Sequence, residues 1–186
     1  MPDSPSPCLL DARQMELHLQ RLCREIAAAF GNNEEMALVG IRTRGLSLAE
    51  RLAAMLRDIL RKDVPLGALD ITLYRDDLSE LAGSPIVRPT EIPFSIKGHT
   101  LVLVDDVIFT GRTIRAAMDA LMDFGRPRAV QVVGLVDRGH RELPIRIDYV
   151  GKNIPTQRSE RVELRGLAGG LDGPLEVVVR EGEGGR

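Results

Sequence analysis

One segment constrains the fold more than any other. Residues 101–113 read LVLVDDVIFTGRT, an apolar run followed by two acids and a glycine between hydroxyl residues. A short, nearly continuous apolar run predicts a strand that is covered on both faces, as in a parallel sheet flanked by helices. Asp105 and Asp106 follow at its carboxyl end, which is the edge of an open α/β sheet where ligands bind. The segment therefore predicts a fold class and the position of a site.

The residues after the two acids suit a phosphate group. Thr110, Gly111 and Thr113 lead into a predicted helix, whose free backbone N–H groups and positive dipole end favour a phosphate dianion. Asp105 and Asp106 can accept hydrogen bonds from vicinal ribose hydroxyls or hold Mg²⁺ through oxygen. Together these groups predict a site for a phosphorylated ribose.

Other interpretations of the acid pair stay open at this level. Two acids at a strand end can simply face water. A mononucleotide P-loop needs Gly-x-x-x-x-Gly-Lys-Ser/Thr, a dinucleotide fold needs Gly-x-Gly-x-x-Gly between strand and helix, and neither pattern occurs here. A phosphoacceptor receiver domain also pairs acids at a strand end, and Asp137 offers a further acid, but no Lys follows in the right place.

Hydrophobic periodicity predicts strands that alternate with helices, and hence a mostly parallel sheet. Helices are expected at 15–30, 46–60 and 113–124. Longer strands are expected at 36–41, 68–74, 100–104 and 129–136, and shorter ones at 147–150, 162–164 and 175–179. The polar stretch 75–97, interrupted by prolines, is expected to be a long loop, and a loop of that length usually has a function.

Composition sets a few outer limits. The chain has 186 residues, 44% hydrophobic and 28% charged, which is ordinary for a globular domain. One domain over 1–186 is expected, with 1–9 and 181–186 disordered. No apolar run approaches the roughly 20 residues of a membrane helix, and residues 1–7 do not resemble a signal peptide, so a cytoplasmic protein without a membrane partner is expected.

Charge and metal-binding residues exclude further classes of function. Two cysteines and three scattered histidines provide neither a disulfide framework nor a zinc site. The net charge of −2 gives no overall attraction to nucleic acid. Any RNA binding must therefore come from a local basic face.

Several segments together resemble one family. The acids and loop at 105–113 resemble the motif that binds phosphoribosyl pyrophosphate (PRPP) in type I phosphoribosyltransferases. Segments resembling the bifunctional pyrimidine operon regulator and uracil phosphoribosyltransferase family lie at 39–45, 70–77, 136–145 and 149–156. The resemblance implies the type I phosphoribosyltransferase fold: an α/β fold with a central, mostly parallel sheet, flanking helices, a small hood and a flexible lid loop. It also implies a reaction in which uracil and PRPP, with Mg²⁺, give UMP and pyrophosphate.

The resemblance assigns roles to individual residues. The catalytic and Mg²⁺-binding positions would be Asp105 and Asp106. Thr43 and Arg44 would lie in the pyrophosphate loop, and Arg75 or Arg88 would reach the pyrophosphate from the lid, which keeps water from the sugar. The base would face Arg138 and the backbone of Val162. The substrate-binding stretch after the acids would be Val107, Ile108, Phe109, Thr110, Gly111, Arg112 and Thr113.

In this family a basic face of a dimer binds the leader mRNA of pyrimidine operons. The positions that match this face are Arg21, Arg24, Arg141 and Arg146. On the first helix, relatives carry a Thr and a His where this chain has Gln20 and Arg24. The resemblance thus implies a homodimer or higher homo-oligomer that binds RNA in response to UMP. Two alternatives stay open: an RNA-binding regulator whose site only senses nucleotides, and a purine phosphoribosyltransferase.

Overall fold

The structure is a computed structural model that describes residues 8–31, 35–77, 86–166 and 175–181. The main sheet has the order β3-β2-β4-β5-β6, and each neighbouring pair is parallel. Its strands are β2 (Met36–Ile41), β3 (Leu66–Leu69), β4 (Thr100–Ile108), β5 (Ala129–Asp137) and β6 (Tyr149–Asn153). The helices are α1 (Ala12–Phe30), α2 (Arg44–Leu60), α3 (Arg112–Met122) and the short η1 (Thr72–Tyr74).

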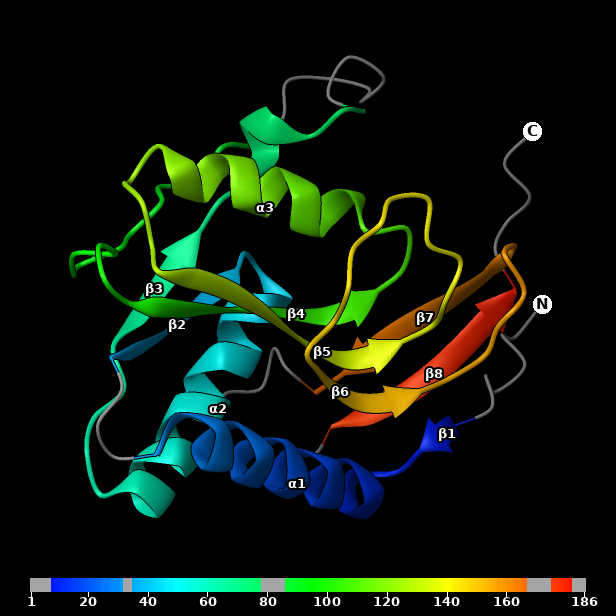
Figure 1. Cartoon of the computed structure of the whole chain (residues 1–186). Coiled ribbons are helices and arrows are strands. Elements are labelled where there is room, and N and C mark those ends of the chain that lie inside the picture. The colour runs from blue at the N-terminus through cyan, green and yellow to red at the C-terminus, as the bar shows by residue number, and fades with distance from the viewer. Residues whose placement is uncertain (1–7, 32–34, 78–85, 167–174, 182–186) are drawn as a thin grey trace.

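A second, antiparallel sheet forms a small hood. Its order is β1-β8-β7, so it joins the two ends of the described chain. Its strands are β1 (Cys8–Leu10), β7 (Glu160–Arg165) and β8 (Glu176–Glu181). The hood lies beyond the carboxyl ends of β4, β5 and β6, on the right in Figure 1. The expected site therefore lies between the main sheet and the hood.

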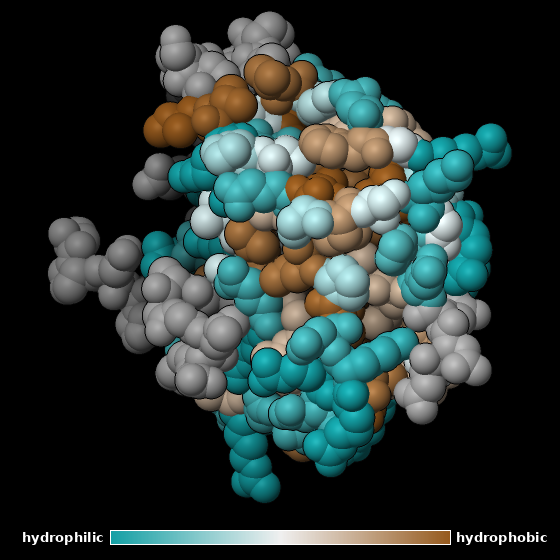
Figure 2. Space-filling model, turned by 90° about the vertical axis from the view of Figure 1, so that its left-hand side faces the viewer, coloured by the Kyte–Doolittle hydropathy of each residue, from teal (hydrophilic) through white to brown (hydrophobic). Residues whose placement is uncertain are grey.

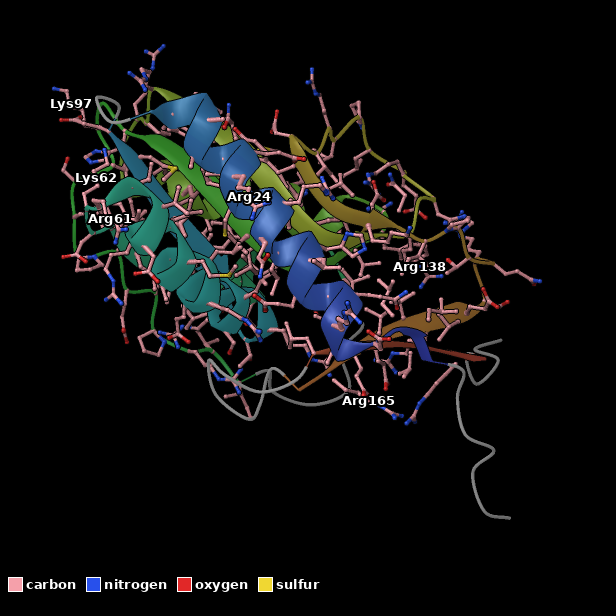
Figure 3. The ribbon with its side chains drawn as sticks, turned by 90° about the horizontal axis from the view of Figure 1, so that it is seen from below. Arg24, Arg61, Lys62, Lys97, Arg138 and Arg165 are labelled. Carbon is pink, nitrogen blue, oxygen red and sulfur yellow. The ribbon has the colours of Figure 1, made fainter. Side chains whose placement is uncertain are left out.

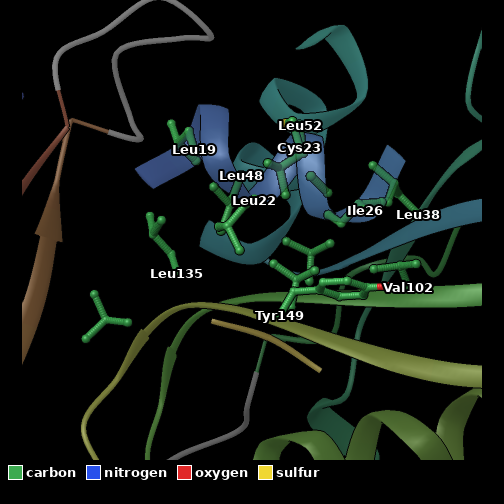
Figure 4. Close-up of a cluster of buried hydrophobic side chains, with 14 of the residues drawn as sticks. Leu19, Leu22, Cys23, Ile26, Leu38, Leu48, Leu52, Val102, Leu135 and Tyr149 are labelled. Carbon is green, nitrogen blue, oxygen red and sulfur yellow. The ribbon is translucent and has the colours of Figure 1, made fainter. Parts of the chain in front are cut away.

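Helices cover both faces of the main sheet, α3 on one side and α1 with α2 on the other (Figure 1). Because side chains alternate along a strand, Leu101 and Leu103 of β4 pack with the α3 layer, while Val102 and Val104 pack with the α1–α2 layer. Figure 4 shows the second layer, where leucine and isoleucine side chains of both helices lie over Val102 and Tyr149. A fully buried side chain of this size contributes about 2 kcal/mol to stability.

The edge of the main sheet formed by the amino ends of its strands differs in surface hydropathy from the carboxyl-end edge. Figure 2 shows this side of the molecule, where hydrophobic residues gather in the middle of the face and hydrophilic residues surround them. The charged groups of the predicted site lie at the opposite edge, where the strands end. Within the described part of the chain, no helix is both long enough and apolar enough to cross a membrane.

The α/β class, the parallel sheet and the flanking helices are confirmed, while several predicted boundaries are wrong by a few residues. Three of these differences have a clear physical reason. The strand predicted at 68–74 ends at Leu69, because the Asp70 carboxylate accepts a hydrogen bond from Thr72 N and turns the chain into η1. The strand predicted at 100–104 continues to Ile108, because pairing with β5 extends that far. Residues 8, 9 and 181 were expected to be disordered, but the first two belong to β1 and the last to β8, because these strands pair in the hood.

The loop expected at 75–97 is only partly described. Residues 78–85, within the expected lid, lie outside the described residues. After that gap the chain lies along the edge strand β3, where Glu91 and Ala68 exchange two backbone hydrogen bonds of 2.8 Å. The Asp70 carboxylate also accepts a hydrogen bond from Arg88 N at 3.1 Å. The second half of the loop is therefore attached to the sheet.

Candidate functional site

The two acids lie inside β4, not beyond it. Asp105 is 8% exposed and accepts a hydrogen bond from Asp106 N at 3.1 Å. Burial and the neighbouring Asp106 raise the pKa of the Asp105 carboxyl group well above its ordinary value. Burial also raises the pKa of Asp106, although the Arg44 guanidinium opposes this shift. Hydroxyl groups or a cation placed against this pair would relieve its repulsion.

Arg44 reaches the acids because α2 lies close to β4. Its Nη1 atom is 3.8 Å from Oδ2 of Asp106. The next residue, Gly45, is where the backbones touch, since a Cβ atom added there would lie 2.4 Å from the Val104 carbonyl oxygen. Thr43 is exposed directly before α2. The sequence-predicted pyrophosphate loop is thus brought next to the acid pair.

The loop after the acids encloses a small hollow at the start of α3. A pocket of about 100 Å³ is lined by Asp105, Ile114 and residues 107–111 and 113. Gly111, the residue before α3, has a φ of +91°, a conformation that favours glycine. The first-turn N–H groups of α3 have no partner within the helix and suit an anion. The structure therefore brings the predicted substrate-binding stretch, apart from Arg112, together around one cavity.

A wider pocket of about 430 Å³ opens beside this loop. It is lined by Arg75, Asp76, Asp77, Thr110, Arg112 and Thr113. Arg112 forms ion pairs with Asp76 and with Glu142, and Arg75 pairs with Asp77. Arg75 thus lines this pocket, with its charge balanced by a neighbouring acid.

The predicted base-binding residues lie on the hood side. Arg138 is 6% exposed and donates to Thr156 Oγ1 and to the Gln157 carbonyl oxygen. Its guanidinium carbon lies 4.1 Å from the centroid of the Phe109 ring, and burial lowers its pKa. Figure 3 shows Arg138 at the opposite end of the molecule from Arg61 and Lys62. A buried cation is therefore fixed beside the loop.

Two other predicted substrate contacts are less direct. The side chain of Val162, on β7, is buried in the hydrophobic core, where β7 pairs with β8. Any contact from Val162 to a ligand would therefore be made by its backbone. Arg88 is exposed, and its backbone N–H is the group tied to Asp70. The structure does not bring the Arg88 side chain into either pocket.

The four predicted RNA-binding arginines fall into two kinds. Arg24, labelled on α1 in Figure 3, and Arg146 are exposed, the latter with 88% of its side chain accessible. Arg21 donates to the carbonyl oxygens of Val150 and Gly151. Arg141, 22% exposed, donates to the Phe109 carbonyl oxygen and pairs with the Asp137 carboxylate. Two of the four are thus already used within the fold.

Several site residues were missed by the sequence reasoning. Asp76 and Glu142 hold Arg112 from two sides, and Glu142 N also donates to the Thr110 carbonyl oxygen at 2.9 Å. His140 packs edge-on against Phe109. Asp76 and Glu142 lie inside segments that carried the resemblance, but nothing in their residue type distinguished them from surface charges. Only the fold shows which charges meet.

The chain supplies few metal-binding side chains at this site. Within the described ranges, no cluster of three or more His, Cys, Asp or Glu side chains is placed to hold a metal ion. Two adjacent carboxylates nevertheless fit Mg²⁺, which keeps several water ligands and is commonly shared with substrate phosphates. Asp105 and Asp106 are therefore the residues that could hold it.

Comparisons with known proteins place this geometry in a family. The sequence model of one protein family, the phosphoribosyl transferase domain, matches residues 8–164 of this chain. The bifunctional protein PyrR of Pelotomaculum thermopropionicum is 54% identical over 173 residues, which cover 93% of this chain and 94% of that protein. The PyrR protein of a Roseiflexus species is 56% identical over 171 residues, covering 91% and 93%. The chain belongs to the phosphoribosyltransferases and, within them, to the bifunctional PyrR family.

Solved structures support the fold assignment. A hypoxanthine phosphoribosyltransferase of Trypanosoma cruzi, in a ternary complex with substrates, superposes with a TM-score of 0.73. It is 22% identical in sequence, and the match covers 94% of this chain and 96% of that one. At this identity the likeness concerns the fold alone. The expected family and the type I phosphoribosyltransferase fold are thereby confirmed for this member of the PyrR family, while its residue roles stay predictions.

Proposed function

We propose that this chain is a uracil phosphoribosyltransferase that converts uracil and PRPP into UMP and pyrophosphate. One observation carries the proposal: the buried acid pair of β4 runs directly into a glycine loop and the amino end of α3. Acids suit ribose hydroxyls, and a helix amino end suits the 5′-phosphate of the same sugar. Membership of the PyrR family supports uracil as the base.

The residues divide the work by charge. Asp105 and Asp106 hold the ribose hydroxyls and face the positive charge that develops on the sugar, while the loop at 107–113 binds the 5′-phosphate. Arg44, beside Asp106, and Thr43 receive the departing pyrophosphate. Arg75, which lines the wider pocket, or Arg88 approaches the pyrophosphate from the lid side. Such catalysis rests on positioning and electrostatics and needs no covalent enzyme intermediate.

Arg138 is the residue proposed to select the base. Its Nε and Nη2 atoms are held by Thr156 and Gln157, so the fixed guanidinium can offer its remaining N–H groups to a pyrimidine carbonyl. The backbone of Val162 completes the base site from the hood. Asp105 and Asp106 would hold Mg²⁺, which neutralises negative charge on the diphosphate of PRPP when bound.

A second function is proposed on the basis of family membership: UMP-responsive binding of pyrimidine operon leader mRNA by a cytoplasmic homodimer or higher homo-oligomer. Arg24 and Arg146 are exposed, and phosphate groups, which dominate RNA affinity, can reach both. The Arg146 guanidinium has a long ion pair of 4.0 Å with Asp148, which a phosphate group would replace. Arg21 and Arg141 belong to the proposed face by position, although their guanidinium groups are engaged in the fold.

The enzymatic proposal is tested with radiolabelled uracil, PRPP and Mg²⁺. UMP should accumulate, and hypoxanthine or guanine offered in place of uracil should give no nucleotide. Nucleotide formation from purine alone would replace uracil by a purine as the substrate. Absence of any product, with RNA binding retained, would favour the regulator whose site only senses nucleotides.

The regulatory proposal is tested by the binding of a pyrimidine leader RNA at several salt concentrations. Affinity should rise with UMP and fall steeply with salt. Replacing Arg24 and Arg146 together by Ala should weaken binding and reduce the salt slope by about two, one for each lost phosphate contact. Binding equal to that of the parent would remove this face from the RNA interface.

A further inference from the structure

Three successive carbonyl groups of the phosphate loop, those of residues 108–110, are held from one side. Arg138 N donates to the Ile108 carbonyl oxygen at 3.1 Å, and Glu142 N donates to the Thr110 carbonyl oxygen at 2.9 Å. Between them, Nη1 of Arg141 donates to the carbonyl oxygen of Phe109 at 2.5 Å. Three successive carbonyls thus accept hydrogen bonds from the segment 138–142.

This arrangement sets the direction of the backbone N–H groups. In a planar trans peptide the C=O and N–H bonds point in opposite directions. The N–H groups that share peptides with the carbonyls of Ile108, Phe109 and Thr110 therefore turn away from segment 138–142. An anion in the adjacent pocket would meet them as donors.

Arg141 differs from its neighbours because it acts through a side chain. Its Nη2 atom pairs with Oδ2 of Asp137 at 2.7 Å, and the other oxygen of Asp137 accepts Gly139 N at 2.9 Å. The guanidinium is therefore fixed between the end of β5 and the loop. Its bond to Phe109 carries a charge, which polarises the peptide and strengthens the donor on its far side.

We propose that Arg141 is a positioning residue for the phosphate loop: by holding the Phe109 carbonyl, it orients and strengthens the N–H groups that bind the 5′-phosphate. The inference rests on the proposed function, since it takes the loop at 107–113 as the 5′-phosphate site. It gives Arg141 a role in catalysis, whereas family resemblance placed it on the RNA face. The role is separable by experiment, because it concerns the phosphate and neither the base nor the sugar.

The test compares UMP with uridine, which lacks the phosphate, by titration calorimetry. Arg141→Met keeps an unbranched, flexible stem and removes the guanidinium with its hydrogen bonds. UMP affinity should fall by about tenfold or more, while uridine affinity should stay at the parent value. Arg141→Lys should recover part of the loss, because it keeps the charge. Recovery should be incomplete, because one ammonium group cannot bridge Phe109 and Asp137 as the guanidinium fork does.

Arg126→Met is the matched control. Arg126 is exposed in the turn that leads into the amino end of β5, so the variant loses the same charge away from the loop. It should bind UMP as the parent does. In steady-state assays Arg141→Met should raise KM for PRPP and leave KM for uracil unchanged, and thermal unfolding will show whether it is folded.

The outcomes separate the two proposals. Equal weakening of UMP and uridine by Arg141→Met would mean a general structural role and overturn the inference. Unchanged UMP affinity, with or without loss of RNA binding, would also overturn it. If the parent fails to convert uracil, the proposed enzyme function falls, yet the difference between UMP and uridine still reports whether Arg141 sets the loop.

Discussion

Asp105 keeps its carboxyl group almost entirely out of water, beside the second carboxyl group of Asp106. Such a pair costs folding free energy, because burial and mutual repulsion both disfavour its charged form. The raised pKa values of both groups express this cost. Hydrogen bonds from ribose hydroxyls, or a bound cation, would lower the unfavourable electrostatic energy of these two carboxyl groups.

Asp105→Asn should separate activity from stability. Turnover of uracil should fall by about tenfold or more, because an amide is a poorer partner for ribose hydroxyls and for positive charge. The midpoint of thermal unfolding should rise, because the substitution removes a buried charge. Parent-like turnover would contradict the assigned role. A lower midpoint would show that the charged pair stabilises the fold.

The sequence located this acid pair but not its surroundings. The apolar run and the two acids predict a strand end, where carboxylates usually face solvent. Asp105 is buried because β4 and β5 pair as far as Ile108 and Asp137, and the length of a strand is set by its partner. Local pattern therefore gave the residues of the site, while their burial depended on a neighbouring strand.

Asp70 is a second buried acid, but its pKa is shifted in the opposite direction from that of Asp105. Burial alone would raise its pKa, but hydrogen bonds from Thr72 and from Arg88 N hold the pKa below its ordinary value. One carboxylate oxygen holds the start of η1, and the other holds the chain as it returns from the lid. This acid therefore fixes both ends of the loop that carries Arg75 and Arg88.

Asp70→Asn should lower the free energy of unfolding by about 2 kcal/mol at neutral pH. A depressed pKa gives stability that is present above the unfolded-state pKa and is lost as pH falls through the folded-state pKa. The difference between parent and variant should therefore shrink below about pH 4. Denaturant unfolding of the parent and of Asp70→Asn at pH 7 and pH 3 measures this difference in the free energy of unfolding. A difference that does not change with pH would exclude the charge as the cause.

At the scale of elements, the phosphate loop depends on contacts that its own sequence does not contain. Its motif predicted the turn into α3, and the structure adds Asp76 and Glu142 on Arg112 and Arg141 on Phe109. These partners come from the segment after η1 and from the segment after β5. Because they are separated along the chain, no local pattern could assign them.

Gly111→Ala tests how closely the loop is fitted. A Cβ atom there would lie 2.9 Å from Cγ1 of Ile145, and the φ of +91° disfavours any residue with a Cβ. Strain of this kind costs about 2 kcal/mol, so UMP affinity should fall by about thirtyfold if the loop moves to relieve it. Ile145→Ala in the same chain should recover part of the loss. No recovery would mean that backbone strain, and not the clash, dominates.

At the scale of the whole molecule, the hood unites residues from both ends of the described chain. Its middle strand, β8, lies between β1 and β7. Val177 and Val178 of this strand are buried, as is Leu175 directly before it. The sequence indicated short strands where β7 and β8 lie, but it gave no sign of β1. The partner of β1 is β8, at the other end of the described chain, and no local pattern links strands so far apart. The main sheet was easier, since alternating strands and helices imply parallel strands, although their order came from the structure alone.

Two truncations should have unequal effects. Removing residues 1–10 takes away an edge strand and one buried leucine, Leu10, and should cost about 2 kcal/mol. Removing residues 175–186 takes away the middle strand and should cost about 5 kcal/mol or more, which approaches the whole stability of a small domain. Thermal unfolding followed by circular dichroism measures both. If both truncated chains unfolded at the same midpoint as the full chain, the hood would contribute little to cooperative folding.

The order of the hood strands also has a consequence for synthesis on the ribosome. β8 follows every other described element in the chain, yet it supports β7, which carries Val162 of the proposed base site. A nascent chain can therefore assemble the central sheet and the phosphate loop before β8 is available to support the proposed base site. Competence to use uracil should appear only after translation has passed the last strand.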